Sequence, residues 1–188
     1  MGIMETVVVI DTETGGLNPE TDAVLQVALV ASGGRTLSVD VLDELGRRGD
    51  VAMSINKIDW EDHKAQALHV MIAALRIKTW LECIQAELPE GARLVIGGHN
   101  TGFDIAMLRR VFHLAGINSP VSWYRSVDTQ TLLFQARLKG EIPDYIQGLD
   151  TALRHFNIDH PGAARHTALG DAIATRALLC HLLETEDC

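Results

Sequence analysis

Apolar residues in the first 45 positions run in short blocks separated by turn residues, a pattern typical of β-strands. The β-branched block TVVVID (6–11) is followed by AVLQVALVAS (23–32) and RTLSVDVLDEL (35–45). The turn signals GGLNPETD and SGG lie between these blocks. The pattern therefore predicts three strands, two of them joined by a tight hairpin.

From about residue 65 the apolar spacing changes to that of a helix. The segment AQALHVMIAALRIKTWLECIQAEL predicts a helix over 65–88, closed by Pro89 and Gly91. The later elements are a strand over 93–98, a helix over 104–116, a strand over 123–130, and helices over 131–138, over 148–156 and after His166. Strands that first form a meander and then alternate with helices predict an α/β fold with a mixed sheet covered by helices.

Length and composition indicate one folded unit. The chain has 188 residues, of which 47% are hydrophobic, so residues 1–188 are expected to form a single domain around one buried core. The net charge of −9 argues against a protein that coats duplex nucleic acid by counterion release. It leaves a nucleic-acid enzyme open, because metal-binding carboxylates add negative charge that bound cations offset.

The cysteines and the N-terminal segment indicate the cellular compartment of the protein. The three cysteines show no CxxC spacing, so neither a disulfide framework nor a structural zinc site is expected. The N-terminal apolar run is too short for a secretory signal, and no stretch approaches the roughly 20 apolar residues of a membrane span. We therefore expect a cytoplasmic protein that contacts no membrane.

Two carboxylates stand at the end of the first predicted strand. Asp11 and Glu13 follow the apolar run VVVI directly, and the period of a strand points both side chains to the same face. A surface pair at a strand end is the simpler interpretation. Carboxylates that end a buried strand, however, usually need a counter-charge, and a cation is one that would serve.

Further ionisable residues occur where other predicted elements begin or end. Asp104 begins a helix, where the helix dipole alone accounts for an aspartate, and Asp128 ends the fifth strand. His166 precedes Asp171 by five residues, and small alanines around Asp171 allow another element to approach closely. A loop histidine and a first-turn aspartate are the simpler interpretation. Four acidic groups from such positions, with one histidine, suit two-metal phosphoryl chemistry with Mg²⁺ or Mn²⁺.

Four segments resemble, in order and in spacing, the successive motifs of the DnaQ-like (DEDDh) 3′–5′ exonucleases. They are VVVIDTETGGLNP, GHNTGFDIAMLRR, SVDTQTLL and RHTALGDAIATRALL. The resemblance spans nearly the whole chain and implies a ribonuclease H-like fold, with a five-stranded mixed β-sheet flanked by α-helices. It also implies a metal-dependent 3′–5′ exonuclease that hydrolyses phosphodiester bonds at the 3′ ends of single-stranded DNA, or of RNA, and releases nucleoside 5′-monophosphates.

Carried over residue by residue, the resemblance assigns the catalytic roles. It makes Asp11, Glu13, Asp104 and Asp171 the ligands of two divalent ions, Mg²⁺ or Mn²⁺, and His166 the general base. Asp11 would bridge both ions, and Glu13 and Asp171 would complete the site of the ion that carries the attacking water. Asp104 would act largely through coordinated water.

The resemblance also assigns contacts with the substrate. The residues predicted to bind it are Thr14, Gly15, Gly16, Leu17, Asn100 and Phe103. The backbone of the first three would receive the terminal nucleotide and its 3′-hydroxyl, Leu17 would wedge against the base, and Phe103 would offer a stacking face. Core packing explains Leu17 and Phe103 equally well, and Asn100 alternatively only shapes its loop. Many relatives carry two threonines after the glutamate, where this chain has ETGG.

Two other segments are interpreted as surface. Asn56 and Lys57 in INKIDWEDH stand where relatives often have a loop beside the active site, but a solvated loop is the favoured interpretation. The pair Arg109 and Arg110 is interpreted as a solvated helix face.

The competing hypothesis is a catalytically silent module that binds nucleic-acid ends or scaffolds a complex. The presence of all five site residues weighs against it. We expect no polymerase-binding extension after the last helix, which favours a free-standing nuclease or one that meets a partner through its core domain. The sequence leaves open whether that partner is a polymerase, another protein or a second copy in a homodimer.

Overall fold

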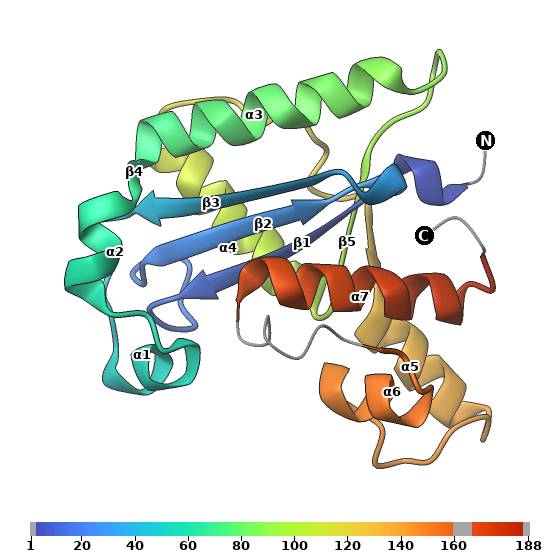
Figure 1. The fold of residues 1–188 in the computed structure, drawn as a ribbon. Helices are drawn as coiled ribbons and strands as arrows, with labels where there is room; N and C mark the ends of the chain where they lie inside the picture. Colours follow the sequence, from blue (N-terminus) through green and yellow to red (C-terminus); the bar gives the residue numbers. More distant parts are fainter. Residues whose placement is uncertain (1–2, 160–166, 186–188) are drawn as a thin grey trace.

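The computed structural model describes residues 3–159 and 167–185, which form one sheet with helices on both sides (Figure 1). The strands are β1 (Val7–Thr14), β2 (Val24–Val30), β3 (Thr36–Leu42), β4 (Leu68–His69), β5 (Val95–Gly98) and β6 (Ser126–Asp128). The α-helices are α1 (Asp50–Asn56), α2 (Trp60–Gln66), α3 (Val70–Glu87), α4 (Thr101–Leu114), α5 (Thr129–Leu138), α6 (Leu149–His155) and α7 (Ala168–Leu182). Two 3₁₀ turns, η1 (Ile3–Thr6) and η2 (Ser32–Gly34), precede β1 and β3.

The sheet is mixed, as predicted, with the strand order β4-β3-β2-β1-β5-β6. The meander β1-β2-β3 is antiparallel, and β5 and β6 extend it in parallel beside β1. The predicted number of five strands was wrong, because β4 pairs with β3 at the edge. Its two residues are too few to show a strand period, and they lead directly into α3, so they fall within a helical pattern.

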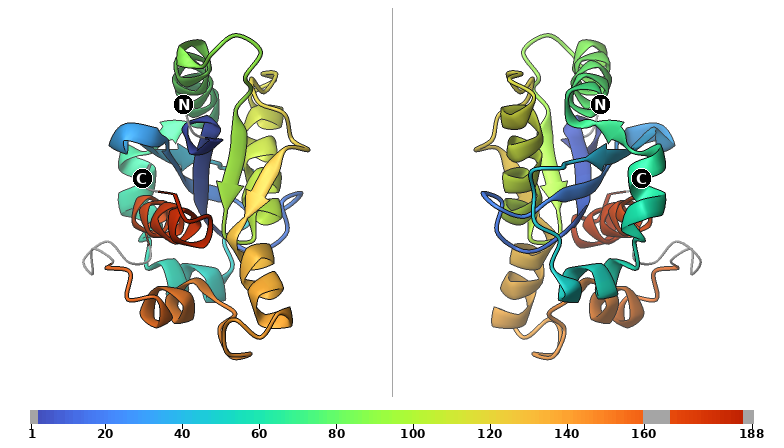
Figure 2. Two further views of the ribbon diagram at one scale, coloured as in Figure 1. Left: turned by 90° about the vertical axis from the view of Figure 1, so that its right-hand side faces the viewer. Right: turned by 90° about the vertical axis from the view of Figure 1, so that its left-hand side faces the viewer.

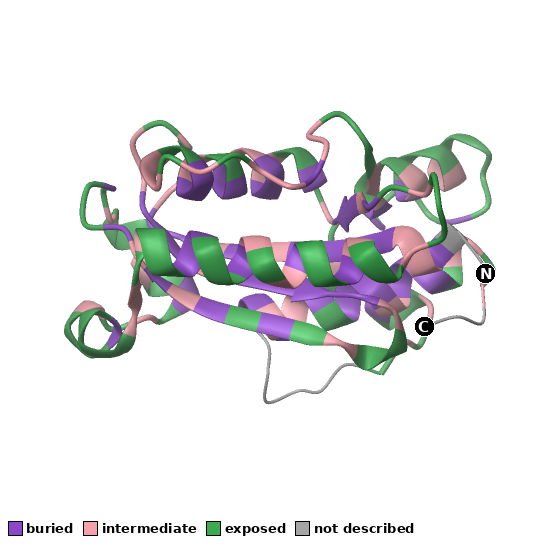
Figure 3. Ribbon diagram, turned by 90° about the horizontal axis from the view of Figure 1, so that it is seen from above, coloured by how far each residue is buried: buried purple, intermediate pink, exposed green. Residues whose placement is uncertain are grey.

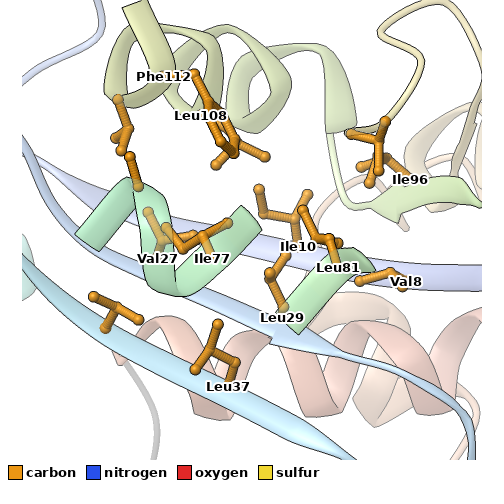
Figure 4. Close-up of a cluster of buried hydrophobic side chains, with 14 of the residues drawn as sticks. Val8, Ile10, Val27, Leu29, Leu37, Ile77, Leu81, Ile96, Leu108 and Phe112 are labelled. Atoms are coloured by element: carbon orange, nitrogen blue, oxygen red, sulfur yellow. The ribbon is translucent and has the colours of Figure 1, made fainter. Parts of the chain in front are cut away.

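Alternation along β1 serves two cores on opposite faces of the sheet. Val8 and Ile10 point toward α3 and α4, whose Ile77, Leu81, Leu108 and Phe112 pack over them (Figure 4). Val7 and Val9 point toward α7, together with Ala28 and Val30 of β2. The side views show α3 and α4 on one side of the sheet and α7 on the other (Figure 2). The predicted sheet covered by helices is therefore confirmed.

Small residues bring α7 close to the sheet. Ala168, Gly170 and Ala172 are buried where α7 crosses β1 and β2. In the middle of α7, Arg176 Nη1 donates a hydrogen bond to the carbonyl oxygen of Val7, at 3.2 Å. The first turn of α7 is thereby held against the end of β1 that carries Asp11.

The segment between β3 and α3 differs from the prediction. The helix expected from residue 65 begins at Val70, and two short helices, α1 and α2, precede it. Asp59 starts α2 by accepting hydrogen bonds from the backbone N–H groups of Glu61 and Asp62. The short helices lack a long apolar repeat, which is why the sequence pattern did not reveal them.

The longest of the described helices is amphipathic. In α3, one face is buried on the sheet and the other is exposed (Figure 3). Across the described residues, no helix combines the length and apolar character needed to cross a membrane.

The two described cysteines differ in their bonding state. Cys83 on α3 is a free, exposed thiol, whereas Cys180 on α7 is buried and disulfide-bonded. The sequence predicts no disulfide framework, and the disulfide bond of Cys180 was not foreseen.

Candidate active site

Three carboxylates meet where the end of β1 faces the start of α7. Asp11 and Glu13 occupy alternate positions of β1 and therefore point to the same side of the sheet. Asp171 lies in the first turn of α7. Ligand oxygens of the three residues all lie within 4.8 Å of one another, and the three side chains are half-buried. The structure thus brings together three of the four predicted metal ligands.

This cluster fits a divalent cation. Three carboxylates so close together repel one another when ionised, and partial burial weakens the screening by water. The positive end of α7 offsets some of this charge at Asp171. Hard oxygen donors without cysteine or histidine suit Mg²⁺ or Mn²⁺. The donor set of Asp11, Glu13 and Asp171 therefore matches the ions predicted from the sequence.

Asp104 lies outside this cluster. It is in the first turn of α4, on the other side of β1, and its carboxylate accepts a hydrogen bond from Thr12 Oγ1 at 2.7 Å. Burial raises the pKa of the Asp104 carboxyl to about 7, although the hydroxyl and the backbone N–H of Thr12 both oppose the shift. Thr12 stands between Asp11 and Glu13, so Asp104 is held beside the cluster but separate from it.

The predicted general base, His166, lies outside the described residues. The residue that follows it, Thr167, is the N-cap of α7 and accepts a hydrogen bond from the backbone N–H of Gly170 at 3.2 Å.

A cavity of about 820 Å³ opens beside Glu13. The end of β1, two loops, α1 and one side chain of α4 form its wall. The predicted substrate residues in this wall are Thr14, Gly15, Gly16, Leu17 and Phe103. Leu17 is 83% exposed, so core packing does not explain it.

Asn100 is not part of the cavity wall. Its backbone adopts a left-handed conformation with φ of 64°, and its N–H donates to Asp128 Oδ1 at 2.9 Å. Asp128 also accepts from the N–H of Thr101 at 3.1 Å and from that of Gln130 at 2.8 Å. Asp128 therefore shapes the turn into α4 and caps α5, and these contacts favour the interpretation that Asn100 shapes this loop.

Helix α1 forms a wall of the cavity that the sequence reasoning missed. Val51 and Ile55 line the cavity and are 75% and 60% exposed. Asn56 is buried, and its Nδ2 donates to the carbonyl oxygen of Thr14 at 3.1 Å. The interpretation of this segment as a solvated loop was therefore wrong at Asn56. The available signal was the pair Val51 and Ile55, one helical turn apart.

Close backbone packing explains the glycines after Thr14. The N–H of Gly15 donates to Ala23, and the carbonyl of Gly15 accepts from Gly49, at 2.8 and 2.7 Å. A Cβ atom on Gly15 would stand 2.2 Å from the carbonyl oxygen of Arg47. A threonine at this position would collide with that backbone, which accounts for the sequence ETGG.

Comparisons with known proteins find relatives over nearly the whole chain. The RNase_T family model, described as an exonuclease, matches residues 8–179. The chain is 34% identical over 185 residues to a DNA polymerase III subunit epsilon-like protein of Rhodobacter capsulatus, covering 95% of this chain and 24% of that protein. It is 29% identical over 184 residues to ribonuclease T of Shewanella frigidimarina, covering 92% of this chain and 80% of that protein.

The fold is shared with a solved structure. Exonuclease I of E. coli, in a zinc-bound complex with single-stranded DNA, superposes with a TM-score of 0.76 at 21% sequence identity, covering 96% of this chain and 40% of that chain. The ribonuclease H-like fold expected from the motifs is thereby confirmed. The chain spans about a quarter of the Rhodobacter relative (24%) and two fifths of exonuclease I (40%).

Proposed function

Because the chain belongs to the exonuclease family, we propose that it is a metal-dependent 3′–5′ exonuclease of single-stranded nucleic acid, active in the cytoplasm. It hydrolyses the terminal phosphodiester bond and releases a nucleoside 5′-monophosphate, with DNA preferred to RNA. The observation that carries the proposal is the meeting of Asp11, Glu13 and Asp171 beside a cavity of about 820 Å³.

The relatives support the substrate class. Exonuclease I was solved with single-stranded DNA, and another relative is named ribonuclease T, so both sugars are represented among similar proteins. The name of the Rhodobacter relative supports a polymerase as a protein partner.

Each part of the site has a proposed task. Asp11, Glu13 and Asp171, with Asp104, would hold two divalent ions, which supply positive charge for the phosphoryl oxygens and for the leaving 3′-oxygen. His166 takes the proton of the attacking water. The backbone of Thr14, Gly15 and Gly16 positions the terminal nucleotide, and Leu17, Phe103 and α1 contact its base.

The central test is a cleavage assay on 5′-labelled single-stranded DNA and RNA, with Mg²⁺ or with Mn²⁺. We expect stepwise shortening from the 3′ end, release of monophosphates, and a block by a 3′-phosphate. Binding without any product, for either sugar and either metal, would instead support the silent binding module. Internal cutting would contradict the proposed direction.

Replacing Asp11 tests the metal requirement. Asp11→Asn is expected to lower the cleavage rate by about a thousandfold, because a shared metal ligand contributes several kcal/mol of charge stabilisation. The affinity for Mn²⁺, measured by electron paramagnetic resonance, should fall in parallel. The exposed Asp62→Asn protein serves as the control. Cleavage that persists in excess chelator would contradict the metal requirement.

Replacing His166 tests the proton transfer. His166→Ala should still bind Mn²⁺ and single-stranded DNA, since the four carboxylates remain, but should cleave about 10²–10⁴-fold more slowly. The loss of rate in acid seen with the wild type should disappear or change. His113→Ala, at an exposed position on α4, is the control. A near-normal single-turnover rate in folded, metal-loaded His166→Ala would exclude His166 as the base.

A further inference from the structure

The side chain of Arg110 is mostly shielded from solvent, in contrast to the solvated helix face predicted for the arginine pair. Its neighbour Arg109 is exposed, but Arg110 forms an ion pair with Asp43, with Nε 2.7 Å and Nη2 3.2 Å from the two carboxylate oxygens. Only 9% of the Arg110 side chain and 1% of the Asp43 side chain are exposed. Asp43 also accepts hydrogen bonds from the N–H groups of Val24 and Gly46, at 3.3 and 3.0 Å. Each carboxylate oxygen of Asp43 thus accepts two hydrogen bonds.

The third nitrogen of the guanidinium reaches a different part of the chain. Arg110 Nη1 donates to the carbonyl oxygen of Glu20 at 2.9 Å and lies 3.4 Å from that of Pro19. One side chain of α4 therefore joins the loop after β1, residues 15–23 (the first loop), to the segment after β3, residues 43–49 (the second loop). A planar guanidinium can serve both at once, whereas the compact ammonium of a lysine cannot.

The two loops are also bonded to each other. The N–H of Ala23 donates to Arg47, and the N–H of Arg47 donates to Thr21, at 2.9 and 2.8 Å. The N–H of Gly49 donates to Gly15 at 2.7 Å. Because Arg110 binds both loops in addition to these contacts, it helps to set how closely the two loops approach each other.

The same loops form much of the cavity wall. Leu17 and Asp22 come from the first loop, and Arg47, Arg48 and Gly49 come from the second. Arg110 itself does not line the cavity. Any effect of Arg110 on a bound nucleotide must therefore pass through the loops.

We propose that Arg110 is a positioning residue for the 3′-terminal nucleotide. With Asp43 it holds the first and second loops at the separation that fits the nucleotide, without touching the substrate. This inference rests on the proposed exonuclease function. A purely structural role predicts instead that Arg110 affects stability and leaves nucleotide affinity in the folded protein unchanged.

The test compares Arg110→Lys with Arg109→Lys, its exposed neighbour on the same helix. Lysine keeps the charge opposite Asp43 but loses the bonds to the first loop. In Mg²⁺, the affinity for deoxythymidine 5′-monophosphate should fall by about ten- to a hundredfold in Arg110→Lys. A small displacement of the two loops is enough for a loss of this size. KM for single-stranded DNA should rise with little change in kcat. Affinity for Mn²⁺ should not change, because Asp11, Glu13 and Asp171 lie on β1 and α7.

A second variant guards against misfolding. Asp43→Asn combined with Arg110→Gln leaves no unpaired buried charge, yet also removes the guanidinium from the first loop. The same loss of nucleotide affinity is expected. In both variants, the amides of Ala23, Arg47 and Gly49 should exchange faster with solvent, while those of β1 should not.

The outcomes separate this inference from the function on which it rests. If the wild type cleaves DNA and binds the monophosphate, but Arg110→Lys binds it equally well, only the inference fails. If nucleotide and Mn²⁺ affinities fall together with the melting temperature, Arg110 stabilises the fold in general and the inference is again wrong. If the wild type neither cleaves DNA nor binds the monophosphate, the proposed function fails and the inference fails with it.

Discussion

Three consecutive side chains of β1 organise carboxylates on both faces of the sheet. Asp11 and Glu13 point toward α7 and meet Asp171, while Thr12 between them points toward α4 and holds Asp104. The two environments differ in solvent access. The first three carboxylates are half-buried, whereas Asp104 is only 4% exposed. The end of one strand therefore positions all four acidic residues predicted for the site.

The burial of Asp104 predicts a pH dependence of stability in metal-free protein. Its raised pKa, about 7, means that the folded state keeps a proton that the unfolded chain releases above about pH 4. The free energy of unfolding should therefore fall as the pH rises from about 4 to about 7. In chelator, the melting temperature of the wild type should drop between these pH values by about 10 °C more than that of Asp104→Asn, because a pKa raised from 3.8 to about 7 corresponds to roughly 4 kcal/mol of unfolding free energy.

The control for this measurement is Glu90→Gln, which removes an exposed carboxylate far from β1 in sequence. It should follow the wild-type pH profile. Identical profiles for the wild type and Asp104→Asn would show that Asp104 does not carry this proton.

The sequence was most informative about side chains whose direction follows from local geometry. Asp11 and Glu13 share a face because strand residues alternate, and Asp171 belongs to the first turn of a helix whose small residues were visible. Arg110 and Asn56 were misread as surface residues because their burial depends on Asp43 and Thr14, which are distant in sequence. The separate position of Asp104 likewise depends on which face α4 covers.

Among the helices, α1 shows what a short element contributes to the cavity. Its apolar residues Val51 and Ile55 face the cavity and are largely exposed. No side chain caps its first turn, where Gly49 is the N-cap. A seven-residue helix without a cap or a buried face gives a weak sequence signal, whereas the long apolar blocks of β1 to β3 and the 18-residue α3 were recognised.

Replacing Ile55 tests the role of this wall. Ile55→Ser should weaken the binding of deoxythymidine 5′-monophosphate by about ten- to thirtyfold, because two to three apolar carbons in contact with the base contribute roughly 2 kcal/mol. Melting temperature should change little, since the side chain is already 60% exposed. Ile72→Ser on α3, at a position 51% exposed, is the matched control. Equal nucleotide affinities in the two variants would exclude α1 as a base-binding wall.

The charge of the protein as a whole limits how it can hold a polyanion. The net charge is −9. Within the described cavity wall, the cationic side chains are Arg47 and Arg48. Arg47 pairs with Asp22 at 3.2 Å, and Arg48 lies 3.9 Å from the centre of the Trp60 ring. Under the proposed function, we therefore expect the affinity for single-stranded nucleic acid to come mainly from the terminal nucleotide and the metal site, and little from the backbone phosphates.

The salt dependence of binding measures how much of the affinity comes from contacts with backbone phosphates. For a single-stranded oligonucleotide at constant Mg²⁺, the logarithm of the affinity should fall with the logarithm of salt with a slope no steeper than about −1.5, since each phosphate contact contributes roughly −0.7. Arg47→Gln should make the slope shallower by about 0.7, and Arg93→Gln, exposed and outside the cavity, should not. A slope steeper than about −4 would indicate an extended phosphate track.

The contact of α7 with β1 joins segments that lie far apart in the sequence and are therefore synthesised at different times. The hydrogen bond from Arg176 to Val7 spans 169 positions, and Asp171 meets Asp11 across a similar stretch. On the ribosome, β1 to β3 emerge long before α7. A growing chain thus exposes two of the clustered carboxylates without the third, and the cluster is complete only after α7 has emerged and docked. If the protein is the nuclease proposed above, the nascent chain therefore lacks a complete carboxylate cluster until α7 has left the ribosome.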